Sequence, residues 1–356
     1  MLPEALRKAF LDQADACEAL GSPFTARLCR LFAAEEIGDT GVRAALANWR
    51  GHEPGPQGDS VPLRLAGALH ALVLENRDAA LAAVYPPHHD ASDDATLWSA
   101  IDAAVAANSE RVLQWLNQPP QTNEVQRSAA LLPGFLWLAR RFRLPFVLSE
   151  IGASAGLNLF WERYGYRLGA DFWGEPNSPV QLAPEWQGPT PGRADVKIMD
   201  RRGCDLSPLN AGRAADRVRL LSYVWADQRE RVRRIRAALD IVAAAGGPPV
   251  DTADAVSWLE ARLNTSSRDA VHVIYHSIAW QYLAEEAQSR GRDLIAEAGR
   301  RARDDAPLAW LSMKADGRQP GAAVTLQFWP GGETLTVARA DFHGRWVTAA
   351  DALAGS

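Results

Sequence analysis

The chain has 356 residues, of which 47% are hydrophobic and 23% are charged, and its formal net charge is −5. This composition is that of a globular protein and excludes a largely disordered chain. The negative net charge disfavours nucleic acid as a partner. The three cysteines lie far apart and form no CxxC or Cys/His cluster, so we expect neither a disulfide framework nor a metal site.

Length and hydropathy suggest where the protein acts. The first residues mix acidic and basic side chains and contain no apolar run of signal-peptide length. The longest apolar stretches, Leu65–Leu74 and Ala129–Ala139, are shorter than the roughly 20 residues that a membrane-spanning helix needs. We therefore expect a cytoplasmic protein that binds no membrane. The length of the chain favours two domains or one domain with a large extension. The sequence leaves the oligomeric state open.

The first part of the chain is expected to be helical. Apolar residues recur at three- and four-residue spacing from Leu6 to about Arg50, and again after a loop rich in glycine and proline at 51–62. Further helices are expected at 63–75, 78–84, 93–116 and 124–141. We assign residues 1–130 to a helical N-terminal domain.

From residue 144 onward, strands and helices are expected to alternate. The apolar run Pro145–Glu150 ends in a glycine-rich turn, which is typical of a buried parallel strand that leads into a helix. Further strands are expected at 196–199, 249–250, 271–275, 308–313, 324–328 and 334–338, and helices at 217–245, 255–263 and 284–304. This alternation predicts an α/β domain over residues 131–356 with a mostly parallel sheet. Residues 165–192, rich in proline and aromatic residues, are expected to be an insertion that forms a hairpin or a lid.

The segment Glu150–Gly156 carries the strongest functional pattern. Its small residues allow a tight turn and a close approach of a ligand to the N–H groups of the next helix, although such turns also serve packing alone. The acid ahead of the glycines disfavours the pyrophosphate of NAD and favours S-adenosylmethionine, which carries a cationic amino group and a sulfonium. The cofactor-binding residues expected in this turn are Glu150, Gly152, Ala153, Ser154 and Gly156.

Two further acidic positions follow candidate strands. Asp205 is expected to hold the ribose hydroxyls of a bound nucleoside, with Asp200 as the rival candidate and a turn-capping role for Asp205 as the alternative. Asp254 and Ala255 form an acid–alanine step that could contact an adenine ring, whereas capping of the next helix would also explain Asp254.

Candidate residues for the methyl acceptor lie in two other segments. His276 follows the strand expected at 271–275 and could act as a general base, or it could be a hydrogen-bonded residue at the end of that strand. Tyr282 is the second catalytic candidate, and a core position is its alternative. The residues expected to bind the substrate are Gln121, Asn123, Glu124 and Arg127, which could equally be ordinary helix-start residues.

With these residues identified, the second half of the chain resembles the class I S-adenosylmethionine-dependent methyltransferases in Glu150–Gly156 and Asp205. The whole chain resembles a bacterial group, the domain of unknown function 2332 family. Segments similar to that group are Gln121–Pro133, Glu150–Phe160, Arg201–Pro208, Tyr223–Asp227 and His276–Tyr282. The resemblance implies a Rossmann-like methyltransferase sheet, mostly parallel with antiparallel strands at its C-terminal edge, and it names no substrate.

Two departures from the wider methyltransferase class bear on function. Ser154 stands where that class usually has glycine, and after Met313 two strands follow with no clear helix between them. An Asn-Pro-Pro-aromatic motif is absent, which argues against methylation of DNA bases or amides. We expect transfer of a methyl group from S-adenosylmethionine to an unidentified small-molecule acceptor. The alternatives are a non-catalytic binding or regulatory module with the same fold, and a nicotinamide-dependent oxidoreductase, which Glu150 disfavours.

Overall fold

The computed structural model describes residues 2–55, 58–88, 92–265 and 268–351. The chain divides into two compact units: a helical unit (Met1–Thr122 and Arg213–Arg236) and an α/β unit (Asn123–Gly212 and Ala237–Ser356). From the sequence we expect all of 131–356 to form the second domain, whereas in the structure Arg213–Arg236 belongs to the helical unit. The physical reason is contact between segments far apart in the sequence, because Asp227 accepts a hydrogen bond from the Phe24 amide at 2.9 Å and Tyr223 belongs to the helical core.

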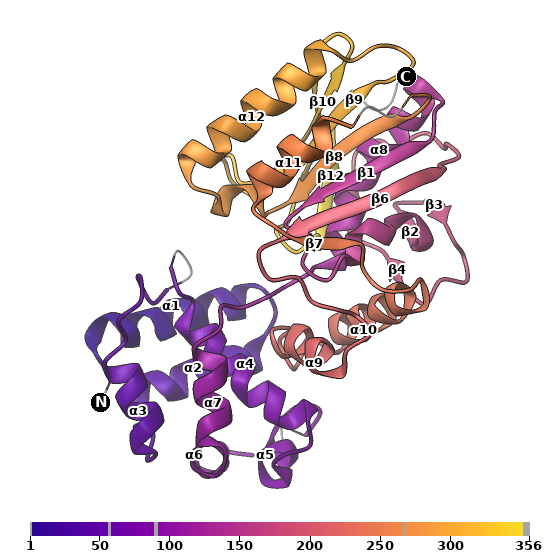
Figure 1. The fold of residues 1–356 in the computed structure, drawn as a ribbon. Helices are drawn as coiled ribbons and strands as arrows, with labels where there is room; N and C mark the ends of the chain where they lie inside the picture. Colours follow the sequence, from indigo (N-terminus) through magenta and orange to yellow (C-terminus); the bar gives the residue numbers. More distant parts are fainter. Residues whose placement is uncertain (1, 56–57, 89–91, 266–267, 352–356) are drawn as a thin grey trace. The chain divides into compact units, whose positions relative to one another are not determined.

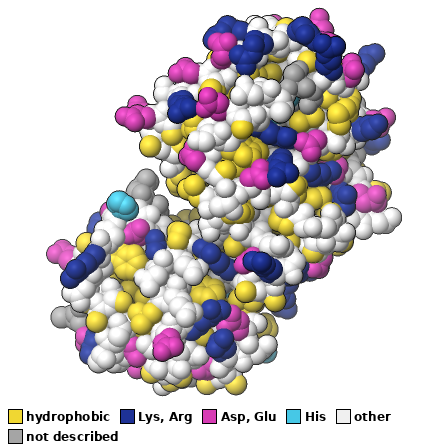
Figure 2. All heavy atoms as spheres, viewed as in Figure 1, with side chains coloured by type: hydrophobic (Ala, Val, Ile, Leu, Met, Phe, Trp, Pro, Cys, Tyr) yellow, Lys and Arg dark blue, Asp and Glu magenta, His cyan; other side chains and the backbone are white. Residues whose placement is uncertain are grey.

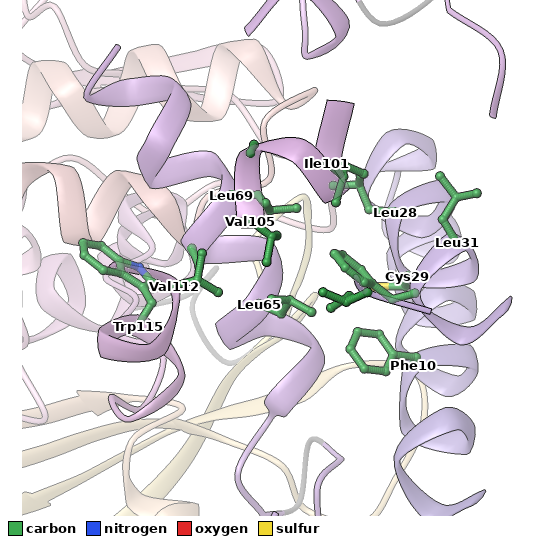
Figure 3. Close-up of a cluster of buried hydrophobic side chains, with 14 of the residues drawn as sticks. Phe10, Leu28, Cys29, Leu31, Leu65, Leu69, Ile101, Val105, Val112 and Trp115 are labelled. Carbon is green, nitrogen blue, oxygen red and sulfur yellow. The ribbon is translucent and has the colours of Figure 1, made fainter. Parts of the chain in front are cut away.

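Buried apolar side chains form the core of the helical unit. Side chains such as Phe10, Leu28, Leu65 and Ile101 point toward one another from four helices (Figure 3). The helices are α1 (Glu4–Ala19), α2 (Pro23–Ala34), α3 (Thr40–Ala47), α4 (Val61–Leu74), α5 (Ala79–Val84), α6 (Asp94–Ala107), α7 (Ser109–Leu116) and α9 (Ala214–Ser222). Residues 93–116 were expected to form one helix but form two, because the chain leaves helical geometry at Asn108.

A nine-stranded sheet forms the centre of the α/β unit, counted over the described residues. Its strands are β1 (Phe146–Ile151), β5 (Glu185–Gln187), β6 (Ile198–Asp205), β7 (Val250–Thr252), β8 (Val271–Ser277), β9 (Leu308–Lys314), β10 (Ala322–Trp329), β11 (Glu333–Ala340) and β12 (Trp346–Ala349). They lie in the order β5-β12-β11-β10-β9-β8-β1-β6-β7. Neighbours from β7 to β9 are parallel, β9 to β12 form an antiparallel meander, and β5 is parallel to β12. The expected α/β class with a mostly parallel sheet and a helical N-terminal region is confirmed.

Helices cover both faces of this sheet (Figure 1). On one face lies α8 (Ser128–Phe142), whose Phe135 ring contacts Tyr275 of β8 edge-on at 5.3 Å. On the other face, α11 (Ala255–Leu263) and α12 (Glu285–Arg300) contribute Leu259 and Ile295 to a cluster with Ile274 of β8. Because successive residues of a strand point to opposite faces, Tyr275 and Ile274 belong to different helical layers.

The segment after the glycine turn differs from the expected α-helix. It is a 3-10 helix, η3 (Leu157–Arg163), in which Phe160 leaves helical geometry. A separate three-stranded sheet follows, in which β2 (Gly165–Leu168) pairs antiparallel with β3 (Asp171–Gly174) and parallel with β4 (Gln181–Leu182). The helix expected at 217–245 is two helices, α9 and α10 (Arg229–Ala244).

Two surface properties concern possible partners. Within the described residues, no helix is both long enough and apolar enough to cross a membrane. Acidic and basic side chains are mixed on the face that Figure 2 shows.

Candidate functional site

The parallel strands of the sheet have a switch point, at which the strand order reverses, between β1 and β8. From β1 the chain proceeds to β6 and then to β7 on one side, and it then crosses to β8 on the other side of β1. The strand order therefore reverses between β1 and β8. In open α/β sheets, ligands bind outside the carboxyl ends of the strands at such a switch point. The predicted segment Glu150–Gly156 lies at the carboxyl end of β1.

The glycine turn has an unusual backbone. Gly152, Ser154 and Gly156 all have positive φ angles, of 69°, 53° and 68°. Glycine adopts this left-handed region at little cost, whereas it is uncommon for a residue with a Cβ atom such as Ser154. A Cβ atom at Gly152 would lie 2.4 Å from the Cβ of Ala279, so this position also requires glycine for packing.

Several amides of this turn already have partners within the protein. The Ala153 amide donates to the Cys204 carbonyl at 2.9 Å, and the Leu157 amide donates to Asn123 Oδ1 at 2.9 Å. The Ser154 amide donates to Asp205 Oδ2 at 3.0 Å. The start of η3 therefore differs from the free helix N-terminus that the sequence pattern suggests. By contrast, the buried Ser154 hydroxyl has no hydrogen-bond partner in the described part of the chain.

Asp205 lies at the carboxyl end of β6, next to the turn. Its two carboxylate oxygens accept from the amides of Ser154 and Ser207, at 3.0 and 2.9 Å. The next residue, Leu206, is 76% exposed, which is unusual for a large apolar side chain. The rival acid Asp200 pairs in register with Val147 near the start of β1 and forms an ion pair with Arg262. Of the two acids, Asp205 is the one that contacts the glycine turn.

A buried hydrogen-bonded cluster surrounds Glu150, and we call it the Glu150 network. Asn158 connects it, because its amide group accepts from the Ser128 hydroxyl at 2.9 Å and donates to the Glu124 carbonyl at 3.3 Å. The Tyr275 hydroxyl donates to the Asn158 carbonyl at 3.1 Å and lies 3.5 Å from Glu150 Oε2. The members of this network are Glu124, Ser128, Glu150, Asn158 and Tyr275.

Glu150 is a buried acid in an unfavourable setting. Only 1% of it is exposed, and within the described residues no basic side chain forms an ion pair with it. Burial raises its pKa well above 4.5, the charge of Asp205 adds to this rise, and the Tyr275 hydroxyl and the charge of Arg127 oppose it. When a cation binds beside a buried carboxyl group that has a raised pKa and no ion pair, it stabilises the charged form of that group.

His276 lies on the opposite face of the sheet. In the β1–β8 register Glu150 pairs with Tyr275, so the next residue, His276, points to the α11–α12 layer. It is fully buried, and its ring stacks on Trp280 at 5.1 Å and lies 6.0 Å from Trp310. Burial lowers its pKa to about 3. The predicted base and the predicted cofactor acid are therefore not brought together.

Tyr282, Asp254 and Ala255 lie after two other strands of the sheet, the first after β8 and the other two after β7. Tyr282 is 74% exposed in the short helix η4 (Trp280–Tyr282) after β8. Asp254 caps α11 by accepting from the Val256 and Ser257 amides, and these bonds lower its pKa, that from the Ser257 backbone most. Ala255 is the first residue of that helix, which follows β7.

The predicted substrate residues fall in two units. Gln121 belongs to the helical unit, whereas Asn123, Glu124 and Arg127 belong to the α/β unit. Asn123 is buried beside the glycine turn, and Glu124 is buried in the Glu150 network. Glu124 also caps η2 (Val125–Arg127) by accepting from the Gln126 amide at 3.0 Å. The Arg127 guanidinium donates to the Phe342 carbonyl at 2.8 Å.

Three members of the Glu150 network are not predicted from the sequence. Ser128, Asn158 and Tyr275 are buried polar residues that connect Glu150 to the backbone around it. One signal was available for Asn158, because it interrupts the apolar run Leu157–Phe160 immediately after the glycine turn. A buried polar side chain inside an apolar run needs a hydrogen-bond partner, and that partner here is the network.

Comparison of the chain with known protein families identifies the family to which it belongs. The pattern of one protein family, described as uncharacterized protein conserved in bacteria (DUF2332), matches residues 7–349. The chain belongs to this family. The resemblance to DUF2332 inferred from the sequence is thereby confirmed. No curated protein matches the chain. In the described residues, no group of three or more His, Cys, Asp or Glu side chains could hold a metal ion.

Proposed function

We propose that this member of the DUF2332 family binds S-adenosylmethionine at the carboxyl ends of β1 and β6 and transfers its methyl group to a small-molecule acceptor. The observation that carries the proposal is the contact between Asp205 and the Ser154 amide, which joins the predicted ribose acid to the predicted glycine turn. The parallel pairing of β1 with β6 supports it, because Ile151 and Cys204 are register partners directly before these two sites.

The residues at this edge fit the chemical groups of the cofactor. Asp205 would accept from the ribose hydroxyls, and the exposed Leu206 would pack on the adenine ring. Glu150 would pair with the cationic amino group, which removes the cost of an unpaired buried acid. The unpartnered Ser154 hydroxyl offers a further donor and acceptor.

Bound S-adenosylmethionine would supply an electrophilic methyl group, and the protein would supply position. Holding donor and acceptor in line can account for a large part of the rate of such a transfer. The buried ring of His276 has no part in this proposal, and Tyr282 remains a prediction for the acceptor side. An acceptor whose nucleophile is already deprotonated in water suits a site of this kind.

A second candidate is a binding module that keeps the fold without turnover. The amides of Ala153, Ser154 and Leu157 favour it, because each already donates to a protein acceptor and the turn is thereby stabilised without a ligand. The two candidates differ in one observable. A catalyst releases S-adenosylhomocysteine when acceptors are supplied, whereas a binding module retains cofactor affinity with no product.

A thermal-shift titration with S-adenosylmethionine and S-adenosylhomocysteine tests the proposal. Ligand at a hundred times its dissociation constant adds about 2.7 kcal/mol to the free energy of unfolding, which corresponds to a rise of several degrees in Tm. We expect that rise in the wild type and its loss in Asp205→Ala. Asp251→Ala on the neighbouring strand β7, an acid paired with Arg202, is the matched control and should keep the ligand response. No rise in the folded wild type at saturating ligand would refute the cofactor site.

A further inference from the structure

The insertion between β1 and β6 contains a pocket with a charge of each sign. The pocket has a volume of about 190 Å³ and lies against β3, and we call it the insertion pocket. Its apolar wall is formed by Phe172, Trp173 and Pro191, while Asp171 and Arg193 provide its charged groups. Pockets that hold drug-sized ligands have roughly 300–1,000 Å³. The insertion pocket is therefore of a size that suits a smaller ligand.

The apolar wall of the pocket is held in place by contacts with the rest of the α/β unit. Trp173 donates its indole N–H to the Ala194 carbonyl at 3.1 Å, and its ring stacks on the buried Trp161 at 5.7 Å. The segment opposite β3 is held as well, because the Gly192 carbonyl accepts from Arg140 and the Thr190 hydroxyl donates to Asp171 Oδ2. A ligand would meet a rigid aromatic surface, which reduces the entropy lost on binding.

The two charged groups of the pocket do not neutralise each other. Among the residues that the structure describes, Arg193 forms no ion pair, with Asp171 or with any other acid. Asp171 uses Oδ2 for the Thr190 hydroxyl and keeps Oδ1 for another donor. A planar guanidinium matches a carboxylate in a two-point hydrogen bond, and a carboxylate accepts from an ammonium group.

We propose that the insertion pocket binds a small zwitterion, an α-amino acid with an apolar side chain. Arg193 takes its carboxylate, Asp171 takes its ammonium group, and the apolar side chain packs against Phe172 and Trp173. Both charges of the ligand are needed, so a peptide terminus, which has one of them, binds more weakly. This site is separate from the carboxyl end of β1 and does not depend on the methyltransferase proposal.

Titration calorimetry of the full chain with L-phenylalanine and L-leucine tests the assignment. Two analogues separate the charges: L-phenylalanine amide lacks the carboxylate, and N-acetyl-L-phenylalanine lacks the ammonium group. We expect each analogue to bind at least about tenfold more weakly than L-phenylalanine, since one charge-assisted hydrogen bond of roughly 1.4 kcal/mol gives that factor.

Two conservative variants give the decisive pattern. Arg193→Gln should make the wild-type difference between L-phenylalanine and its amide disappear, and Asp171→Asn should do the same for the N-acetyl analogue. Asp195→Asn and Lys197→Gln remove exposed charges that do not line the pocket and should leave all affinities unchanged. Asparagine at position 171 keeps an acceptor for Thr190, so folding should be preserved, and circular dichroism checks this.

The position of the ligand can be checked independently. The indole N–H resonance of Trp173, identified by its absence in Trp173→Phe, should shift when L-phenylalanine is added. The proposal is overturned if no amino acid binds to the folded wild type, if the amide binds as tightly as the free acid, or if the Trp173 resonance stays in place while another tryptophan shifts.

Discussion

The two faces of the sheet near the carboxyl ends of β1 and β8 differ in how they bury titratable groups. On the α8 face, Glu150 lies in a hydrogen-bonded network with Tyr275 and Asn158. On the α11–α12 face, His276 lies among the rings of Trp280 and Trp310, and its two nitrogens have no hydrogen-bond partner in the described residues. Adjacent residues of β8, Tyr275 and His276, thus belong to two different environments.

This difference indicates that His276 is a packing residue, whereas Glu150 is a candidate functional residue. Burial drives both groups toward their neutral forms, since it raises the pKa of Glu150 and lowers that of His276 to about 3. A neutral His276 serves as an aromatic ring in an aromatic cluster. Glu150 has polar neighbours at the switch point of the sheet and forms no ion pair among the described residues, which makes it a candidate for binding a ligand.

The largest effect that we predict concerns the aromatic face. Trp280→Ala should lower the free energy of unfolding by about 3–5 kcal/mol, because it removes a fully buried indole from between His276 and Trp310. The control two residues away is Tyr282→Ala, which removes an exposed ring and should change stability by no more than about 0.5 kcal/mol. Urea denaturation measures both. Similar values for the two variants would show that this face is not a packed core.

The carboxyl-edge residues could be predicted from the sequence because they are local to strand ends. The apolar run that ends in Glu150 predicts β1, and the glycine-rich turn must follow at its carboxyl end. Asp205 comes at the end of a strand in the same way, although β6 extends well beyond the expected 196–199. Parallel neighbours bring their carboxyl ends to one edge, so the proximity of Ser154 and Asp205 follows from these two features.

The environment of each side chain could not be predicted in the same way. Alternation along β8 separates Tyr275 from His276, but only the register with β1 determines which of them shares a face with Glu150. Likewise, β5 joins the sheet by pairing with β12, about 160 residues later in the chain, and no local pattern encodes a contact of that range. The assignment of Arg213–Arg236 to the helical unit also depends on distant contacts, such as Asp227 with Phe24.

The second prediction tests whether Glu150 costs stability. Between pH 4.5 and its raised folded pKa, Glu150 holds a proton in the folded protein that the unfolded chain releases. The free energy of unfolding should therefore fall as pH rises from about 4.5 toward the raised pKa, by about 1.4 kcal/mol for each pKa unit of the shift. Glu150→Gln should remove this loss and be more stable than the wild type at pH 8, while it binds S-adenosylhomocysteine more weakly.

Asp341 is the matched control for Glu150, since it is also a buried acid. Burial alone would raise its pKa, but hydrogen bonds from the Arg345 side chain and from the His343 and Arg345 amides lower it below its usual value. Asp341→Asn should therefore destabilise the protein at pH 8, opposite in sign to Glu150→Gln. If Glu150→Gln is also destabilising at pH 8, the acid is a structural member of its network and the comparison between the two faces fails.

The smallest effect is expected at His276. His276→Phe keeps a ring against Trp280, so at pH 7 the free energy of unfolding should change by less than about 1 kcal/mol. Because the pKa of His276 falls from 6.5 to about 3 on folding, its neutral form contributes stability that is fully present above pH 6.5 and is lost as pH falls toward 3. The variant should lack that loss in acid.

His272 is the control for His276, and its pKa is lowered to about 4. Because Ser149 Oγ lies 2.8 Å from His272 Nε2, His272→Phe should lower the free energy of unfolding by about 1–3 kcal/mol even at pH 7. A comparable cost for His276→Phe, together with weaker S-adenosylhomocysteine binding, would mean that its ring nitrogens serve the site after all and would restore His276 as the candidate base.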